Sequence, residues 1–303
     1  MTDDLPIVDA HQHFWDAGAG RYPWLSTDPL PVFRYGDYAA LPRRYLPDDF
    51  RRDAAGHRVV ATVHMEAERE IADEVGETRW LAGLRKEHGL PTVAVGHARF
   101  EAPDVGEVLA GHAAFDFVRG IRQKPAAAAR PADARRGAPG SMDDPAWRRG
   151  YALLERHRLH FDVQTPWWHL DAAADLARDF PRIPIVINHT ALPADRNALA
   201  LAAWRRVLET AAAQPNVALK ISGLGQADKS WPHERNRHVV RDAIAIFGVA
   251  RCMFASNFPV DGLCIGYRAL FEAFKAFVAD RPADQQRALF HDNAVRTYRM
   301  TGI

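Results

Sequence analysis

Short apolar runs alternate with longer helical patterns along almost the whole chain, and this alternation restricts the folds that the chain can adopt. We expect eight strands, at residues 7–11, 59–66, 92–99, 115–121, 160–165, 183–189, 216–221 and 252–256. Most of them are rich in Val, Ile and Phe and carry few charges, which is typical of strands buried on both faces of a parallel sheet. The pattern therefore predicts an α/β protein.

Helical periodicity fills the spaces between these strands. Apolar residues recur at helical spacing in residues 70–88, 144–157, 172–179, 198–213, 238–247 and 267–278. Eight strands in 303 residues favour a (β/α)8 TIM barrel that occupies residues 1–303 as a single domain. The alternative is a large doubly wound sheet, but no Gly-x-Gly-x-x-Gly follows the first strand, which argues against a dinucleotide-binding domain.

Two segments are long for connections within such a barrel. Residues 16–50 are rich in Pro, Tyr and Trp and follow the first strand, while residues 124–140 combine Ala, Arg, Pro and Gly after the fourth. Because long loops in compact domains are usually functional, we expect both to be inserts near the active site. The second would be a lid or an irregular surface loop.

The composition limits the classes of molecule that we expect the protein to bind. Lys and Arg number 39 against 38 Asp and Glu, which gives a formal net charge of +1 and no electrostatic argument for nucleic acid or membranes. The two cysteines, Cys252 and Cys264, form no disulfide framework, and the N-terminus lacks the basic and apolar regions of a signal peptide. We therefore expect a cytoplasmic protein that acts on a small molecule, with its oligomeric state left open.

The strongest chemical motif lies at the end of the first strand, where His11 and His13 are separated by one residue. Residues i and i+2 of a strand point to the same side, so the two imidazoles can converge on one point at the barrel rim. Such a pair can hold a metal such as Zn²⁺ or bind a carbonyl or carboxylate directly.

Polar residues also end the sixth and eighth strands. His189 follows the apolar run 183–187, where a barrel places catalytic groups, although it could instead cap the next helix. Asn257 would face the barrel mouth after the eighth strand. Asp261 lies four residues further along the loop, as a catalytic group or as a cap of the helix near residue 267.

Five segments together resemble a known family. They are HQHFW at 11–15, RYPWL at 21–25, VRGIRQ at 118–123, KISGL at 220–224 and SNFPV at 256–260. The chain resembles the amidohydrolase-2 group of the amidohydrolase superfamily, within it the branch of fuconolactone-type sugar lactonases and 2-pyrone-4,6-dicarboxylate lactonase. The resemblance runs from Ile7 to Tyr298 and implies a (β/α)8 barrel that hydrolyses a lactone.

The resemblance also implies residue roles. His11, His13 and His189 take the positions of the family's catalytic or metal-binding histidines. Asn257 stands where the family usually has the aspartate that activates water, and Gln164 stands where metal-dependent members have another histidine. Relatives in this branch often lack that histidine, so we expect either no cofactor or one divalent metal, zinc first, on the three histidines.

The general base is not identified by the resemblance, because Asn257 replaces the usual aspartate. Because an amide cannot accept a proton at neutral pH, the base would be one of the three histidines, Asp261 or Glu66. Glu66 ends the second strand and could equally orient a histidine.

Further residues would contact the substrate. Arg122 ends the fourth strand and could bind a carboxylate with two parallel hydrogen bonds. Lys220 lies inside the seventh strand, so its ammonium needs water or a carboxylate near the mouth. Trp15 and Trp24 could stack on a sugar ring or pack the loops. We assign Gln164 and Glu66 to the same substrate-binding group.

Two other functions remain open. One is a metal-dependent decarboxylase on the same scaffold, against which Gln164 and Asn257 both count because such relatives use a full set of metal ligands. The other is a small-molecule-binding homologue whose catalysis has been impaired by Asn257.

Overall fold

A parallel sheet of eight strands is the centre of the molecule in the computed structural model, which describes residues 5–19 and 21–303. The strands are β1 (Ile7–Gln12), β6 (Val59–Met65), β7 (Val93–His97), β8 (Val118–Gln123), β9 (His160–Val163), β10 (Ile185–Ile187), β11 (Val217–Ile221) and β12 (Cys252–Phe254). They pair in chain order, as the alternation of apolar runs predicts. The (β/α)8 barrel is therefore confirmed.

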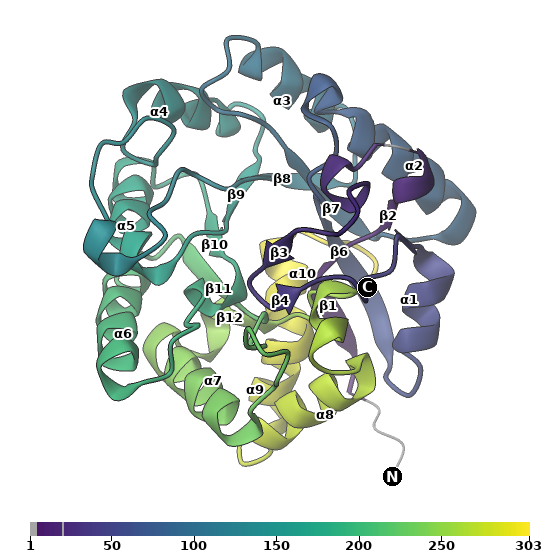
Figure 1. Cartoon of the computed structure of the whole chain (residues 1–303), viewed down its shortest axis with the longest axis vertical. Helices are drawn as coiled ribbons and strands as arrows, with labels where there is room; N and C mark the ends of the chain where they lie inside the picture. The colour runs from purple at the N-terminus through teal and green to yellow at the C-terminus, as the bar shows by residue number, and fades with distance from the viewer. Residues whose placement is uncertain (1–4, 20) are drawn as a thin grey trace.

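Helices surround this sheet, and Figure 1 shows them as an outer ring. They are α1 (Pro47–Asp53), α2 (Gly76–His88), α3 (Val105–Ala113), α4 (Pro145–Tyr151), α5 (Leu170–Asp179), α6 (Ala198–Ala212), α7 (His233–Phe247), α8 (Tyr267–Phe277), α9 (Ala283–Arg287) and α10 (Asn293–Thr297). Within the described ranges, none of these helices has both the length and the hydropathy needed to cross a bilayer.

Helices α1, α3, α9 and α10 lie outside the helical ranges that the sequence predicts, and α7 begins earlier than predicted. Helix α3 buries only Val105, Leu109 and His112 and contains two glycines, so its apolar periodicity is weak. Helix α7 begins at His233 rather than at residue 238, because its first turn is polar and charged. Tertiary packing therefore sets the limits of these helices more than the apolar pattern does.

The barrel closes where the first strand meets the segment after the last one. The backbone N–H of Asn257 donates to the His11 carbonyl at 2.7 Å, and the N–H of His13 donates to the Phe258 carbonyl at 2.8 Å. The buried Asp9 carboxylate accepts the backbone N–H of Ser256 at 2.9 Å across the same seam. The residues that close the barrel are thus the sequence-predicted site residues or their neighbours.

A one-residue irregularity in β1 turns the two histidines into the barrel. Val8 and Ala10 belong to the apolar cluster that fills the barrel interior, so strict alternation would point residues 11 and 13 outward. The register with β6 shifts between Asp9 and Gln12, as it does in a β-bulge. His11 and His13 consequently face the mouth, above that apolar cluster.

The insert at residues 16–50 folds over the mouth. Strand β2 (Trp15–Asp16) pairs with β5 (Arg44–Tyr45), and β3 (Val32–Phe33) pairs with β4 (Gly36–Asp37) in a hairpin. Figure 1 shows β3 and β4 over the centre of the ring of strands. Gly36 has a φ of +77°, and a Cβ there would lie 2.6 Å from the Ala227 carbonyl oxygen, so only glycine allows this close approach.

A buried ion pair crosses the inside of the barrel. The Lys220 ammonium lies 2.7 Å from Asp162 Oδ1, and both side chains are fully buried. Asp162 also accepts hydrogen bonds from Asn188 Nδ2 and the Tyr298 hydroxyl, at 2.7 and 3.2 Å. Burial lowers the pKa of Lys220 to about 8, against the opposing attraction of Asp162. Asp162 thus provides the carboxylate that balances the charge of Lys220 inside the strand.

We expect Lys220→Met to destabilise the fold by about 3 kcal/mol, because it leaves the Asp162 carboxylate buried without its cation. Urea unfolding followed by circular dichroism measures the change. The matched control is Lys86→Met on the exposed face of α2, which should stay within about 0.5 kcal/mol of the parent. An equal effect of both substitutions would contradict a structural role for the buried pair.

Candidate active site

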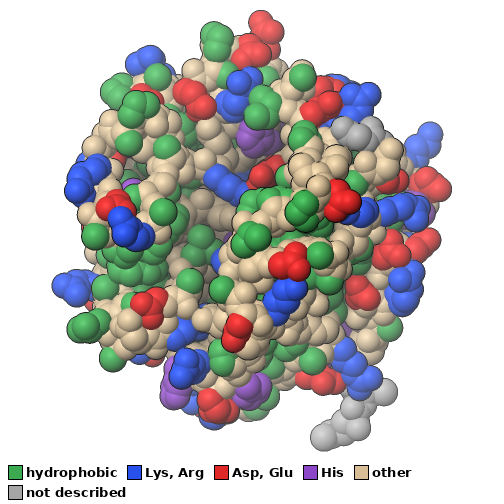
Figure 2. All heavy atoms as spheres, viewed as in Figure 1, with side chains coloured by type: hydrophobic (Ala, Val, Ile, Leu, Met, Phe, Trp, Pro, Cys, Tyr) green, Lys and Arg blue, Asp and Glu red, His purple; other side chains and the backbone are tan. Residues whose placement is uncertain are grey.

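The barrel mouth contains a pocket of about 210 Å³ below the β3–β4 hairpin. Its lining includes His13, Trp15, Trp24, Phe33, Arg34, Tyr38, Glu68, Arg122, Lys124, Gln164, His189 and Asn257. Figure 2 looks onto this face and shows hydrophobic side chains gathered over its centre, beside a hollow. Seven sequence-predicted site residues therefore meet in one cavity: His13, Trp15, Trp24, Arg122, Gln164, His189 and Asn257.

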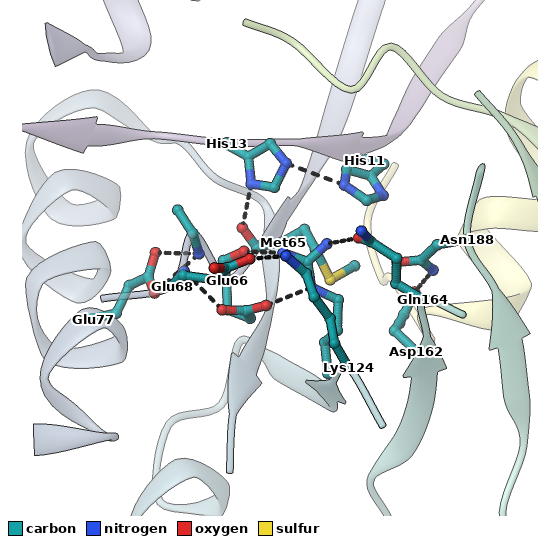
Figure 3. A network of polar contacts seen from close by, with 12 residues as sticks. His11, His13, Met65, Glu66, Glu68, Glu77, Lys124, Asp162, Gln164 and Asn188 are labelled. Carbon is teal, nitrogen blue, oxygen red and sulfur yellow. Dashed lines mark hydrogen bonds and ion pairs between the residues drawn. The ribbon is translucent and has the colours of Figure 1, made fainter. Parts of the chain in front are cut away.

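Three imidazoles lie together at the floor of this pocket. His11 Nε2 and His13 Nε2 are 3.2 Å apart, and Figure 3 shows the two rings side by side. The ring centroids of His11 and His189 are 4.5 Å apart. His13 and His189 line the pocket, whereas His11 is fully buried behind them.

The proton on neutral His13 can be placed from its partners. His13 Nδ1 lies 2.8 Å from the Met65 carbonyl oxygen, which can only accept, so Nδ1 carries the hydrogen. Nε2 of neutral His13 therefore carries the lone pair, which faces His11 Nε2 at 3.2 Å. Asn257 Oδ1 lies 3.3 Å from the same His13 nitrogen.

Asp261 fixes the amide of Asn257. Asn257 Nδ2 donates to Asp261 Oδ1 at 2.6 Å, which leaves the amide oxygen facing His13. The Tyr35 hydroxyl donates to the same carboxylate oxygen at 2.7 Å, and the Gly223 N–H donates to Oδ2 at 3.1 Å. Gly223 has a φ of +66°, and a Cβ there would lie 2.8 Å from His189 Cβ. Asp261 is thus held behind Asn257 and does not line the pocket.

Burial keeps the histidines neutral. Loss of hydration, followed by the positive charges of Lys220 and Arg122 and the neighbouring histidines, holds the pKa of His11 well below its usual value. Burial likewise lowers the pKa of His13 and His189, and Arg122 adds to both effects. Neutral imidazoles can accept a proton or donate a hydrogen bond across the pH range in which most enzymes work.

Arg122 is positioned by two side chains. Its Nε donates to Glu66 Oε1 at 2.5 Å, and Nη1 donates to Gln164 Oε1 at 3.0 Å. Burial alone would raise the pKa of Glu66, but Arg122 lowers it to about 2. Glu66 is therefore an ionised partner of Arg122, and Gln164 helps to orient the same guanidinium.

The predicted aromatic residues lie on the wall of the pocket. The indole N–H of Trp15 donates to the Pro42 carbonyl at 2.9 Å, and that of Trp24 donates to the Ala67 carbonyl at 2.8 Å. Their rings meet edge to face at 5.5 Å. Each ring thus packs the loops and also lines the pocket, and stacking on a sugar ring stays a prediction.

The donor set does not make a closed zinc site. Zinc takes three or four strong ligands, but here the convergent atoms are the Nε2 atoms of His11 and His13 and the neutral amide oxygen of Asn257. His189 directs its Nδ1 to the Ser222 hydroxyl at 2.9 Å. Among the described residues, no three His, Cys, Asp or Glu side chains are arranged to hold a metal ion.

Some residues that line the pocket are not predicted from the sequence. Arg34 and Tyr38 come from the middle of the 16–50 insert, and Lys124 directly follows β8. The signal that could have found Arg34 is its place in a loop rich in aromatic residues after the first strand. Lys220 shows the opposite case, because it lies in the barrel interior and does not line the pocket.

The chain is similar to known proteins in sequence and in structure. A sequence model of the family described as Amidohydrolase matches residues 8–300. An uncharacterized protein of Sinorhizobium fredii, y4mH, is 41% identical over 297 residues, which cover 98% of this chain and 99% of the relative. An L-fucono-1,5-lactonase of Burkholderia multivorans is 30% identical over 308 residues, with 96% of this chain and 95% of the relative covered.

A solved structure resembles the fold. The crystal structure of an amidohydrolase from Burkholderia multivorans, with bound zinc, superposes with a TM-score of 0.79 at 26% identity. The alignment covers 97% of this chain and 99% of the other. The likeness therefore extends over the whole barrel and its loops.

A second buried carboxyl supports the loop beside Arg122. Glu77 of α2 lies 3.0 Å from His64 Nε2 and accepts the backbone N–H of Ala67 at 3.0 Å. His64 Nδ1 in turn accepts the N–H of Phe14, next to His13, at 3.1 Å. Burial, with the charge of Glu66 adding to it, raises the pKa of Glu77 to about 8.

Glu77 should therefore make the fold less stable as the pH rises. The folded state keeps its proton up to about pH 8, whereas the unfolded chain loses it near pH 4.5, so this contribution falls between those values. Glu77→Gln should flatten the fall by up to a few kcal/mol, and urea unfolding across this pH range measures it. Exposed Glu107→Gln is the control, and a stability difference between the wild type and Glu77→Gln that does not change with pH would contradict the shift.

Proposed function

The chain belongs to the amidohydrolase family, and from that premise we propose that it is a lactonase, which opens a small lactone by attack of water on the ring carbonyl. One observation carries the proposal: His13, whose Nε2 carries the lone pair when the ring is neutral, and His189 line the same pocket as Arg122. A neutral base beside hydrogen-bond donors suits the hydrolysis of an activated cyclic ester.

His13 is the base in this proposal. Its Nε2 takes a proton from water as the oxygen bonds to the lactone carbonyl carbon. The new Nε2–H then points at Asn257 Oδ1, 3.3 Å away, which stabilises the protonated ring. When the tetrahedral intermediate collapses, the ring C–O bond breaks and His13 returns the proton to the departing oxygen, which gives the open hydroxy acid.

His189 is the group that polarises the carbonyl. Its Nδ1 lies 2.9 Å from Ser222 Oγ, and if the serine hydroxyl donates, neutral His189 keeps a hydrogen on Nε2. That N–H can donate to the carbonyl oxygen as negative charge develops on it. Three of the five N–H groups of Arg122 donate to Glu66 and Gln164, which leaves two that can donate to the substrate.

Asp261 acts through Asn257 in this mechanism. The carboxylate holds Asn257 Nδ2 and thereby keeps the amide oxygen turned toward His13. It is a positioning residue, and it replaces the direct action that the family's aspartate has at position 257. No step needs a metal ion, because the convergent donors here do not complete a zinc site.

The first test of the function is turnover. Protein purified without added metal should open lactones of a panel of sugar lactones and pyrone carboxylates, detected by proton release. The activity should survive a chelator, and elemental analysis should find less than stoichiometric zinc. Chelator-sensitive turnover with one bound zinc would contradict the metal-free mechanism. Release of carbon dioxide without ring opening would favour a decarboxylase, and binding without turnover would favour an inactive homologue.

Asp261→Asn should lower kcat by about tenfold to a hundredfold with little change in KM, because an amide offers one acceptor oxygen where the carboxylate accepts from Asn257, Tyr35 and Gly223, so the Asn257 amide is no longer held in one orientation. Steady-state kinetics on the best lactone of the panel measures both constants. Asp116→Asn, at an exposed position, should leave them unchanged. A large rise in KM at constant kcat would instead mean that Asp261 serves in substrate binding.

A further inference from the structure

Three cationic side chains line the pocket, and they differ in how their charge is balanced. Arg122 is paired with Glu66 at 2.5 Å, and Lys124 is paired with Glu68. Arg34 also lines the pocket, but no carboxylate of the described part of the chain forms an ion pair with it. Arg34 is therefore the cation of the pocket that has no carboxylate in direct contact, since Asp261 lies beyond the Tyr35 hydroxyl.

The hydrogen bonds of Arg34 also show that it lacks an acceptor for part of its guanidinium. Its Nη2 donates to the Tyr35 hydroxyl at 2.7 Å, and its guanidinium carbon lies 4.6 Å from the Tyr35 ring centroid. Its Nη1 is buried and has no hydrogen-bond partner among residues 5–19 and 21–303. A buried N–H of a charged group is costly to leave without an acceptor, so the site is built to receive one.

The backbone places Arg34 opposite Arg122. Arg34 and Tyr35 form the two-residue tip between β3 and β4, and the tip is anchored because the Tyr35 hydroxyl donates to Asp261 after β12. Arg122 comes from β8, which is four strands away from β12 in a ring of eight. The two guanidiniums thus approach the histidines from opposite sides of the mouth.

We propose that Arg34 binds an anionic group of the substrate, a carboxylate, and so selects carboxylated lactones over neutral sugar lactones. This inference rests on the proposed function and narrows it. The carboxylate would accept the unused Nη1 hydrogens of Arg34, while the ring carbonyl lies toward His13 and His189. A charge-assisted hydrogen bond within a pocket is strong enough to distinguish an anion from a neutral isostere.

A competing explanation gives Arg34 a structural role only. It would then hold the hairpin tip through Tyr35 and would influence Asp261 through the same hydroxyl. Tyr35→Phe removes that link and keeps the charge of Arg34, whereas Arg34→Gln removes the charge. A structural role makes the two variants behave alike, and an anion-binding role separates them.

The experiment is titration calorimetry with 2-furoate and 2-furamide, two ring compounds of similar shape that differ in charge and are not hydrolysed as lactones. We expect the wild type to bind furoate at least about tenfold more tightly. Arg34→Gln should bring that ratio close to one. Tyr35→Phe should keep the ratio, as should Arg268→Gln at an exposed position. Thermal melts confirm that each variant is folded.

Three results would overturn the proposal. They are a wild type that does not distinguish the two probes, an Arg34→Gln variant that still distinguishes them, and equal losses of both probes in Arg34→Gln and Tyr35→Phe. Since the probes report binding alone, an Arg34-dependent preference for furoate without any lactone turnover would uphold the anion site and overturn the lactonase. Turnover of neutral lactones with no preference for furoate would do the reverse.

Discussion

The seam between the first and last strands is the constraint on which the rest of the structure depends. A barrel must pair its two edges, and here the pairing uses the backbone of His11, His13 and Asn257. Two of them, His13 and Asn257, also act in the proposed mechanism, so their side chains are fixed as precisely as the barrel itself. Asp9 strengthens this seam from the buried side, and burial raises its pKa to about 6.

Closing the barrel at the active site has an electrostatic consequence. The closed barrel buries three imidazoles near Lys220 and Arg122, and that environment disfavours a further positive charge on any of them. The ring of His13 can take a proton only if an oxygen stabilises it, and Asn257 supplies that oxygen because Asp261 holds the amide in one orientation. An amide at position 257 is therefore compatible with hydrolysis when a carboxylate stands directly behind it.

The sequence predicts the barrel well because strands buried on both faces have a distinctive composition. It also predicts that His11 and His13 converge, since alternate residues of a strand share a side, and their Nε2 atoms are indeed 3.2 Å apart. The sequence cannot predict whether the two histidines point into the barrel or away from it. Val8 and Ala10 already occupy the barrel interior, and only the register shift turns the histidines inward. The position of Arg34 depends on how a 35-residue insert folds (residues 16–50), and local patterns do not fix such a fold.

In the proposed function, different parts of the structure carry out the reaction and select the substrate. The histidines sit on barrel strands or directly after them, where backbone pairing and a packed core prevent movement. Arg34 sits on a two-residue hairpin tip that meets the barrel through the Tyr35–Asp261 hydrogen bond. Because Asp261 also orients Asn257, the residue that anchors the hairpin is the residue that orients the partner of the base. A change at the hairpin tip can therefore alter the charge that the pocket accepts while the strands keep the histidines in place, whereas loss of Asp261 itself would disturb the orientation of Asn257.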